Sequence, residues 1–205
     1  MLDRHLRPLI DRTLAGVARL SARAGVKPDA LTAAGLGLGL LAALSVAFGW
    51  FWPALLLFAA SRLMDGLDGA VARLSPAGPL GGYLDIMADF AIYAALPLGF
   101  AAFDPESNAL PAAFLLAAFF VNGASFLGFA VLAEKRGLES RANGEKAHYH
   151  ATGLIEGSET IAFFLAVCLW PAGFAWLALL FALLVLATAA WRVRAAAVLF
   201  RDQEH

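Results

Sequence analysis

The chain has 205 residues, of which 61% are hydrophobic and 15% are charged, and its mean hydropathy is +0.73. These values exclude an ordinary soluble globular domain. With a formal net charge of −1 we expect no nucleic acid partner. We therefore expect an all-α membrane protein that forms a single domain over residues 1–205.

The first predicted element is an amphipathic juxtamembrane helix over residues 1–28. Its apolar residues recur at helical spacing, while arginines are mixed through its whole length. Because no continuous apolar core forms, the segment does not read as a cleavable signal. Such a helix lies along the inner surface of the membrane. The alternative is an extended basic tail.

Six apolar segments follow and predict a six-helix transmembrane bundle over residues 31–197. A spanning helix needs about 20 mostly apolar residues to cross the hydrocarbon layer. The predicted spans, in chain order, are Leu31–Phe51, Pro53–Leu74, Gly81–Phe103, Leu110–Ala133, Thr152–Trp170 and Gly173–Ala197.

Lysine and arginine are concentrated in alternate connecting segments. Six precede the first span and four lie in the loop 134–151, whereas the turns "GWFW", "DPESN" and "WPAG" contain none. By the positive-inside rule, both termini, the loop 134–151 and the turn between the second and third spans face the cytoplasm. We expect a multi-pass protein of the cell inner membrane, surrounded by membrane lipids.

Four aspartates, Asp65, Asp68, Asp85 and Asp89, interrupt the second and third spans. One bare aspartate at the centre of a span costs about 2.5 to 3.5 kcal/mol, so these acids require compensation. Each pair is spaced to occupy one face of its helix. At a rise of 1.5 Å per residue, Asp65 and Asp89 both lie about 12 Å below the inner boundary, and the other two lie about 6 to 7 Å below it.

The link "SPAG" between these spans is short and rich in turn residues, which predicts two antiparallel neighbouring helices. Their four carboxylates then converge and need a counter-charge. Mg²⁺ or Mn²⁺ are the natural neutralisers, and four carboxylates can hold one or two such ions. A metal site at this depth, open to the cytoplasm, suits the binding of a diphosphate.

Glycines and arginines accompany the aspartates. Gly69 and Gly81 remove side chains where a ligand must come close, and Arg73 supplies a forked donor for phosphate. The alternative is that the glycines serve helix packing and that the acids pair with Arg62 and Arg73. We favour the metal site, because two arginines cannot balance four buried acids.

The stretch "DGLDGAVAR", followed by Gly81, Asp85 and Asp89, resembles the signature of the CDP-alcohol phosphatidyltransferases. That signature is D-x-x-D-G-x-x-A-R, a spacer of eight or nine residues, and G-x-x-x-D-x-x-x-D. Its first half fits without a mismatch, but the spacer "LSPAGPL" has only seven residues. The family's six-helix topology, its N-terminal surface helix and the entry "KPDALT" to the first span are also similar here. The resemblance covers essentially the whole chain.

The resemblance implies that the four aspartates ligate two divalent ions and that Asp89 also acts as the general base. It implies that Gly69, Arg73 and Gly81 contact the cytidine diphosphate part of the donor. The implied reaction is attack by an alcohol hydroxyl on the lipid-side phosphorus of a CDP-activated lipid, CDP-diacylglycerol, with release of CMP. The family also leads us to expect a homodimer.

The small alcohol acceptor must be recognised by residues outside the signature. Glycerol 3-phosphate is the favoured acceptor, by a small margin over inositol phosphate and serine. Glu156 and Glu159 begin the fifth span on the side of the metal site, where they can bind a polyol hydroxyl or complement the helix dipole. Basic residues near the entry suit a phosphorylated acceptor, although they equally mark the cytoplasmic side. They are Lys135, Arg136, Arg141 and Lys146.

Two other functions compete with this one. Membrane prenyltransferases also hold Mg²⁺-diphosphate on intramembrane aspartates, but their two motifs are expected to be well separated in a chain of more spans. A divalent-cation carrier would need polar positions across the bilayer, whereas "FAIYAALPLGF" and "PALLLFAAS" are apolar beyond the acids. The sequence therefore favours a pocket that opens to one side.

Overall fold

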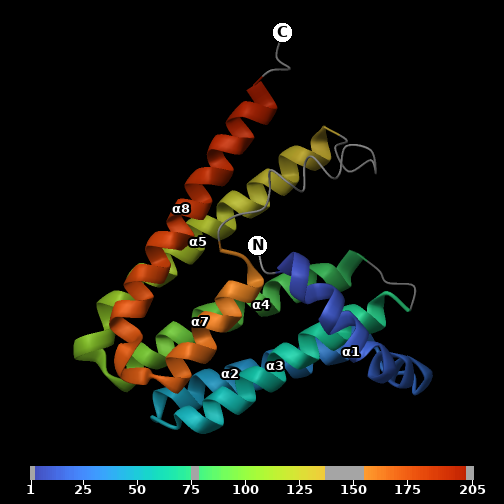
Figure 1. Ribbon diagram of the computed structural model, residues 1–205, viewed down its shortest axis with the longest axis horizontal. Coiled ribbons are helices and arrows are strands. Elements are labelled where there is room, and N and C mark those ends of the chain that lie inside the picture. Colours follow the sequence, from blue (N-terminus) through green and yellow to red (C-terminus); the bar gives the residue numbers. More distant parts are fainter. Residues whose placement is uncertain (1–2, 75–78, 137–154, 202–205) are drawn as a thin grey trace.

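The computed structural model describes residues 3–74, 79–136 and 155–201, with the backbone alone for 3–12, 79 and 201. Within these ranges the chain is helical and has no strand, as predicted (Figure 1). The elements are α1 (Asp3–Arg23), α2 (Pro28–Ala47), α3 (Phe51–Ala72), α4 (Pro79–Phe103), α5 (Pro105–Lys135), α7 (Gly157–Leu169), the 3₁₀ turn η1 (Pro171–Gly173) and α8 (Phe174–Arg201).

In the described part of the chain, four segments are long and apolar enough to cross a membrane: Pro28–Ala47, Leu80–Phe103, Pro105–Lys135 and Pro171–Phe200. These are α2, α4, α5 and η1 with α8. Six spans were predicted. Of the two remaining helices, α3 has 22 residues but carries Arg62 and two aspartates, and α7 has only 13 residues. Their crossing of the membrane stays a prediction.

Two helix boundaries differ from the predicted ones for local reasons. α2 ends at Ala47, before the predicted Phe51, because Gly49 has a φ of 75°, a backbone conformation that favours glycine. α5 begins at Pro105 rather than at Leu110. The Asp104 side chain accepts a 3.2 Å hydrogen bond from the backbone N–H of Ser107, so "DPESN" is a helix start rather than a plain turn.

α2 lies against both helices that carry the acids. Its small residues permit this, since a Cβ on Gly35 would lie 3.3 Å from the carbonyl oxygen of Ser61 in α3. A Cβ on Gly99 of α4 would lie 2.5 Å from the carbonyl oxygen of Ala43 in α2. α3 and α4 run antiparallel, as predicted, but have hardly any close backbone contact with each other. Their side chains therefore meet across a space that α2 bounds.

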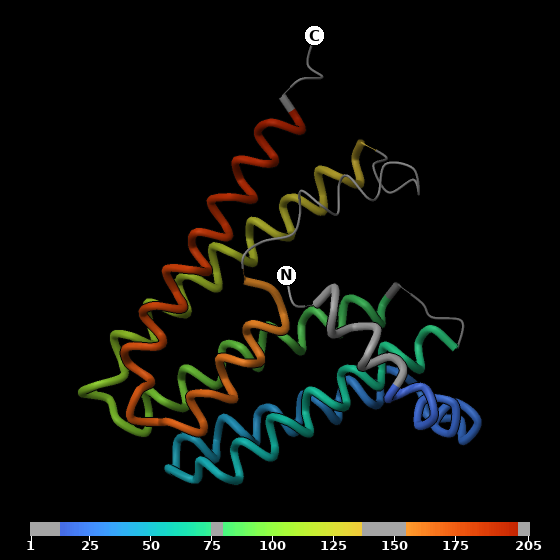
Figure 2. Tube along the Cα trace, in the orientation of Figure 1, coloured from blue at the N-terminus to red at the C-terminus, as the bar shows by residue number. Residues whose placement is uncertain are grey.

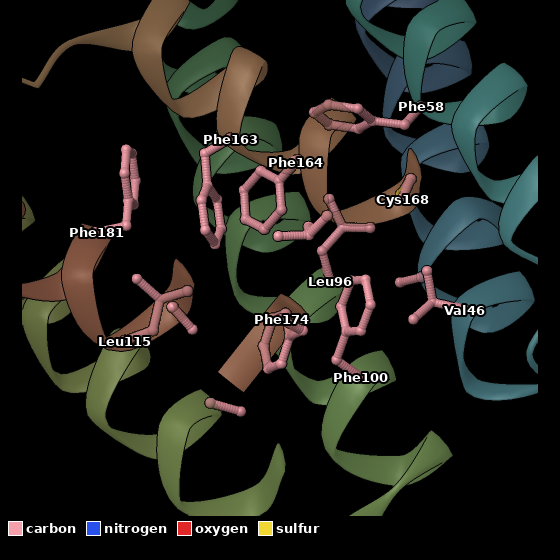
Figure 3. Close-up of a cluster of buried hydrophobic side chains, with 14 of the residues drawn as sticks. Val46, Phe58, Leu96, Phe100, Leu115, Phe163, Phe164, Cys168, Phe174 and Phe181 are labelled. Atoms are coloured by element: carbon pink, nitrogen blue, oxygen red, sulfur yellow. The ribbon is translucent and has the colours of Figure 1, made fainter. Parts of the chain in front are cut away.

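An apolar core rich in aromatic rings packs between α2, α3, α4, α5, α7 and α8 (Figure 3). Phe100 and Phe174 stack with ring centroids 4.2 Å apart, and Phe163 and Phe181 stack at 4.3 Å. α5 and α8 lie side by side and complete this core together with α7 (Figure 2). The four aspartates are not among the residues of this core.

The N-terminal segment is a helix rather than an extended tail, and α1 packs on α3. Ala18 is buried in a small cluster with Leu67, Ala70 and Val71, whereas Leu20 is exposed. α1 lies across the end of α3 that carries the aspartates (Figure 1). Its position on the membrane surface remains a prediction, and its packing brings the turn after Arg23 next to the acids.

Candidate functional site

The structure brings the four predicted acids together at one end of α3 and α4. Each of the four carboxylates interacts electrostatically with the other three. Asp68 is 5% exposed, while the side chains of Asp65 and Asp89 are 31% and 32% exposed. We call Asp65, Asp68, Asp85 and Asp89 the acid cluster.

A buried arginine contacts Asp65 and Asp89, the two acids that are predicted to lie deeper in the membrane and are called the deeper acids below; Asp68 and Asp85 are called the shallower acids. The Arg62 side chain is 8% exposed, its Nη1 pairs closely with Oδ1 of Asp89, and the same nitrogen lies 3.7 Å from Oδ1 of Asp65. Pairing of the acids with Arg62 and Arg73 was disfavoured above because two arginines cannot balance four buried acids. The structure corrects that weighting, since Arg62 neutralises part of the cluster and leaves the rest uncompensated.

α2 contributes a polar side chain to the cluster. The hydroxyl of Thr32 donates a 2.5 Å hydrogen bond to Oδ2 of Asp68, and Thr32 is itself buried. The same hydroxyl lies 3.2 Å from the carbonyl oxygen of Pro28, one turn earlier. The acids therefore have different surroundings. Thr32 donates a hydrogen bond to Asp68, whereas Arg62 lies beside Asp65 and Asp89.

A cavity of about 460 Å³ opens beside the shallower acids. Its walls are the turn between α1 and α2, the start of α2 and the facing ends of α3 and α4. Gly25, with a φ of 75°, forms the turn that shapes one wall. The polar and glycine lining includes Lys27, Asp29, Thr32, Asp68, Gly69, Gly81 and Asp85. A cavity of this size and polarity can hold a phosphorylated ligand.

The donor atoms of the cluster suit a hard divalent cation. They are carboxylate oxygens, the ligands that Mg²⁺ and Mn²⁺ prefer, and Oδ1 of Asp85 is buried without a hydrogen-bond partner. A buried carboxylate oxygen in this state is favourable only with a cation nearby. In the ranges that the structure covers, no three Asp, Glu, His or Cys side chains already stand in a complete ligand arrangement. The acids must therefore shift slightly to hold an ion.

The predicted cytidine diphosphate contacts occupy two different positions. Gly69 and Gly81 both line the cavity, where a Cβ on Gly81 would lie 3.4 Å from Oδ1 of Asp29. Arg73 follows the end of α3 and is exposed. Its Nη1 lies 3.7 Å from the position of a Cβ on Gly69, so the guanidinium folds back along the helix toward the cavity.

The predicted acceptor residues that the structure describes lie at the start of α7 and at the end of α5. Glu156 caps α7, and its backbone N–H donates a 3.0 Å hydrogen bond to Oε2 of Glu159, so both acids serve the helix start. Lys135 ends α5, and the Arg136 guanidinium lies over the ring of Phe200, 5.2 Å from its centroid. The other two predicted residues, Arg141 and Lys146, lie outside the described residues.

Arg192 of α8 is a buried cation that was not predicted as a site residue. Its side chain, 5% exposed, donates a 2.9 Å hydrogen bond to Oδ1 of Asn122 and a 2.8 Å hydrogen bond to Oγ of Ser125. It also interacts electrostatically with Glu156. These contacts join α8 to α5 and to the start of α7, the region predicted to receive the acceptor.

Comparison with known sequences decides the family. The family model described as CDP-alcohol phosphatidyltransferase matches residues 26–200. The chain belongs to the CDP-alcohol phosphatidyltransferase family. The inner membrane protein YnjF of Escherichia coli (strain K12) is 46% identical over 175 residues, which are 85% of each chain. As a family member the protein is a transferase of the kind that acts in phospholipid synthesis.

Solved structures share the fold of this CDP-alcohol phosphatidyltransferase. The crystal structure of Mycobacterium tuberculosis phosphatidylinositol phosphate synthase (PgsA1) with CDP-DAG bound is similar with a TM-score of 0.71 and 23% identity, over 91% of this chain and 94% of that one. The same synthase in complex with manganese and citrate gives a TM-score of 0.69 and 23% identity, over 89% and 88%. At this identity the likeness concerns the fold.

Sequence reasoning did not single out Thr32 or Asp29 as site residues of this family member. Both stand in the entry "KPDALT", which was noted only as similar to the family. The available signal was position, because the start of the first span lies at the same depth as the shallower acids. Position alone could not show which helices pack on α2, and therefore could not show which acid Thr32 contacts.

Proposed function

We propose that the protein transfers the phosphatidyl group of CDP-diacylglycerol to a small alcohol and releases CMP. The observation that carries this proposal is that Asp68 and Asp85 of the acid cluster line a cavity that Gly69 and Gly81 also line. A diphosphate needs counter-charge and close backbone approach in the same place, and this arrangement offers both. CDP-DAG is bound in the M. tuberculosis synthase of the same fold, which supports it as the donor.

Asp89 is the proposed general base. It accepts the proton of the acceptor hydroxyl while the new oxygen–phosphorus bond forms and the bond to the CMP oxygen breaks. Arg62 pairs with Oδ1 of Asp89, so that oxygen is held while the carboxylate remains ionised. Base catalysis by a positioned carboxylate contributes about 10² to 10⁴ in rate.

The acid cluster is proposed to hold two ions of Mg²⁺ or Mn²⁺, and manganese is present in a structure of the M. tuberculosis synthase. Bound there, the ions would supply charge stabilisation for the diphosphate and for the departing CMP. Gly69 and Gly81 leave room for the donor, and Arg73 provides a fork of N–H donors beside them.

Glycerol 3-phosphate remains the leading acceptor. Lys135 and Arg136 lie at the end of α5, on the side predicted to face the cytoplasm, and offer positive charge to a phosphorylated alcohol. Glu156 and Glu159 are proposed to bind acceptor hydroxyls in addition to capping α7. Arg141 and Lys146 belong to the same proposal.

The proposed setting is the cell inner membrane, with six spans, both termini and the site at the cytoplasmic side, and a homodimer as the assembly. The E. coli relative is an inner membrane protein, which supports this location. The core also argues against a cation carrier, because Phe58, Leu96 and Phe100 are fully buried where an ion path would continue.

An acceptor panel tests the proposed reaction. Purified protein in mixed micelles receives CDP-diacylglycerol, Mn²⁺ or Mg²⁺, and glycerol 3-phosphate, inositol phosphate or serine in separate samples. We expect CMP release with one acceptor and none without it. The proposal fails if no acceptor yields CMP, and consumption of a prenyl diphosphate instead would identify a prenyltransferase.

A further inference from the structure

We infer that Arg62 is a positioning residue that competes with divalent cations for the two deeper acids of the cluster. The inference rests on the proposed use of metal at this site. Arg62 thereby serves as a permanent internal counter-ion of the acid cluster. The four acids belong to the family signature, and Arg62 lies outside it.

Contacts on several sides fix the Arg62 side chain. Its guanidinium lies against the rings of Phe58 and Tyr93, with Cζ 5.6 Å and 5.8 Å from their centroids. Its Nη2 donates a 3.1 Å hydrogen bond to Oγ of Ser61, which in turn donates a 2.7 Å hydrogen bond to the carbonyl oxygen of Gly35. Arg62 is thus anchored to α2, α3 and α4.

Another nitrogen of the guanidinium, Nη1, faces one acid from each helix. It pairs with Asp89 of α4 and lies 3.7 Å from Asp65 of α3. Because α3 and α4 have hardly any close backbone contact here, Arg62 is a direct link between them at this level. The two shallower acids line the cavity instead. The four acids therefore divide into a pair that contacts Arg62 and a pair that lines the cavity.

The charge of Arg62 cannot be removed at any physiological pH, because a guanidinium stays protonated. It cancels one of the four negative charges from a buried position. A divalent cation that binds Asp65 and Asp89 must approach this positive charge, and repulsion at such distances is strong inside a protein. Arg62 therefore lowers the affinity of the site for cations while it holds Asp89 in place.

Variants at Arg62 separate this role from a merely structural one. Arg62→Gln removes the charge and keeps an amide N–H₂ that can still donate hydrogen bonds, although its side chain is shorter. Arg62→Lys keeps the charge but loses the planar fork. Arg194→Gln is the matched control, since it removes the same charge from an exposed position on α8. Mn²⁺ binding is measured by electron paramagnetic resonance of the free ion, and thermal unfolding is followed with and without Mn²⁺.

We expect Arg62→Gln to bind Mn²⁺ about tenfold more tightly than the wild type, while CMP release at saturating Mn²⁺ falls at least about tenfold. Without Mn²⁺ it should melt at a lower temperature, and Mn²⁺ should raise its melting temperature by more than in the wild type. Arg62→Lys should keep a Mn²⁺ affinity within about threefold of the wild type. The control should change neither affinity nor turnover.

Unchanged or weaker Mn²⁺ binding by folded Arg62→Gln overturns the inference. If this variant folds only with Mn²⁺ present, its affinity is measured by withdrawing the ion with a chelator, and the same criterion applies. The metal-binding result does not depend on the reaction. If the wild type binds Mn²⁺ but releases no CMP, the proposed function fails. The Mn²⁺ affinities of the wild type and of Arg62→Gln still test whether Arg62 competes with cations.

Discussion

The hydroxyl of Thr32 in α2 donates a 2.5 Å hydrogen bond to Asp68 in α3, 36 residues further along the chain. Asp68 is buried, so this bond orients its carboxylate before a ligand binds. The first turn and a half of α2 therefore belongs to the site as much as the signature itself. A threonine outside the signature sets the direction of a signature acid.

Thr32→Val tests this relationship, because valine keeps the shape and removes the donor. Hydrogen bonds to charged groups contribute about 1.5 to 3 kcal/mol, so we expect Mn²⁺ affinity and CMP release at limiting Mn²⁺ to fall about tenfold or more. Thr32→Ser retains the hydroxyl and should stay close to the wild type. Unaltered metal affinity in Thr32→Val would show that the bond does not orient Asp68.

Asp89→Asn should abolish transfer and leave the fold intact. Asparagine keeps an oxygen that can accept from Arg62 but cannot take the acceptor proton, so CMP release should fall at least about 100-fold. Thermal unfolding checks the fold. Asp104→Asn is the control, since it removes an acid from the start of α5 and asparagine caps a helix as well as aspartate. Near-normal turnover in Asp89→Asn would remove the base assignment.

Gly69→Ala should impair donor binding without harming the protein. Its Cβ would lie 3.7 Å from Nη1 of Arg73, an ordinary contact, and alanine favours a helix over glycine by about 1 kcal/mol. The melting temperature should therefore stay equal or rise, while the new methyl group narrows the cavity and raises the KM for CDP-diacylglycerol about tenfold. Gly37→Ala is the control, since a Cβ there would lie in open space on α2. Its melting temperature should likewise stay equal or rise, and its KM for CDP-diacylglycerol should not change. An unchanged KM in Gly69→Ala would place the donor elsewhere.

Removal of divalent ions should stop the reaction reversibly. After dialysis against a chelator we expect no CMP release, and recovery when Mn²⁺ or Mg²⁺ is added. Because Oδ1 of Asp85 is buried without a partner, Asp85→Asn should need about tenfold more Mn²⁺ for half-maximal activity. Glu106→Gln, at the exposed start of α5, should not change this requirement. Full activity in the presence of the chelator would contradict the metal role.

The spacing of the acids was predictable because it follows from local geometry. In any α-helix, residues three or four apart share a face, so the pairs in α3 and α4 were known before the fold. The helix order was likewise predictable from the apolar runs. Helix ends were less predictable. The backbone conformation of Gly49 decides the end of α2, and a hydrogen bond to the Asp104 side chain decides the start of α5.

The partner of each acid was not predictable from spacing. The sequence offered Arg62 and Arg73 as equivalent counter-charges, three residues before and five residues after the two acids of α3. Arg62 joins the cluster because α4 carries Asp89 to the same depth, 27 residues away in the chain. Thr32 is a partner because α2 packs on α3. Such choices depend on how helices are placed, which no pattern within one helix contains.

The sequence by itself determined that this chain is an apolar helical protein with four acids on two helices, because composition and helical periodicity are properties of short segments. The tertiary structure alone decided that α2 packs on both of those helices, that Arg62 holds Asp65 and Asp89 and that Asp68 and Asp85 line a cavity. The physical reason is that packing joins residues distant in sequence, and the electrostatic balance of a buried site depends on those neighbours.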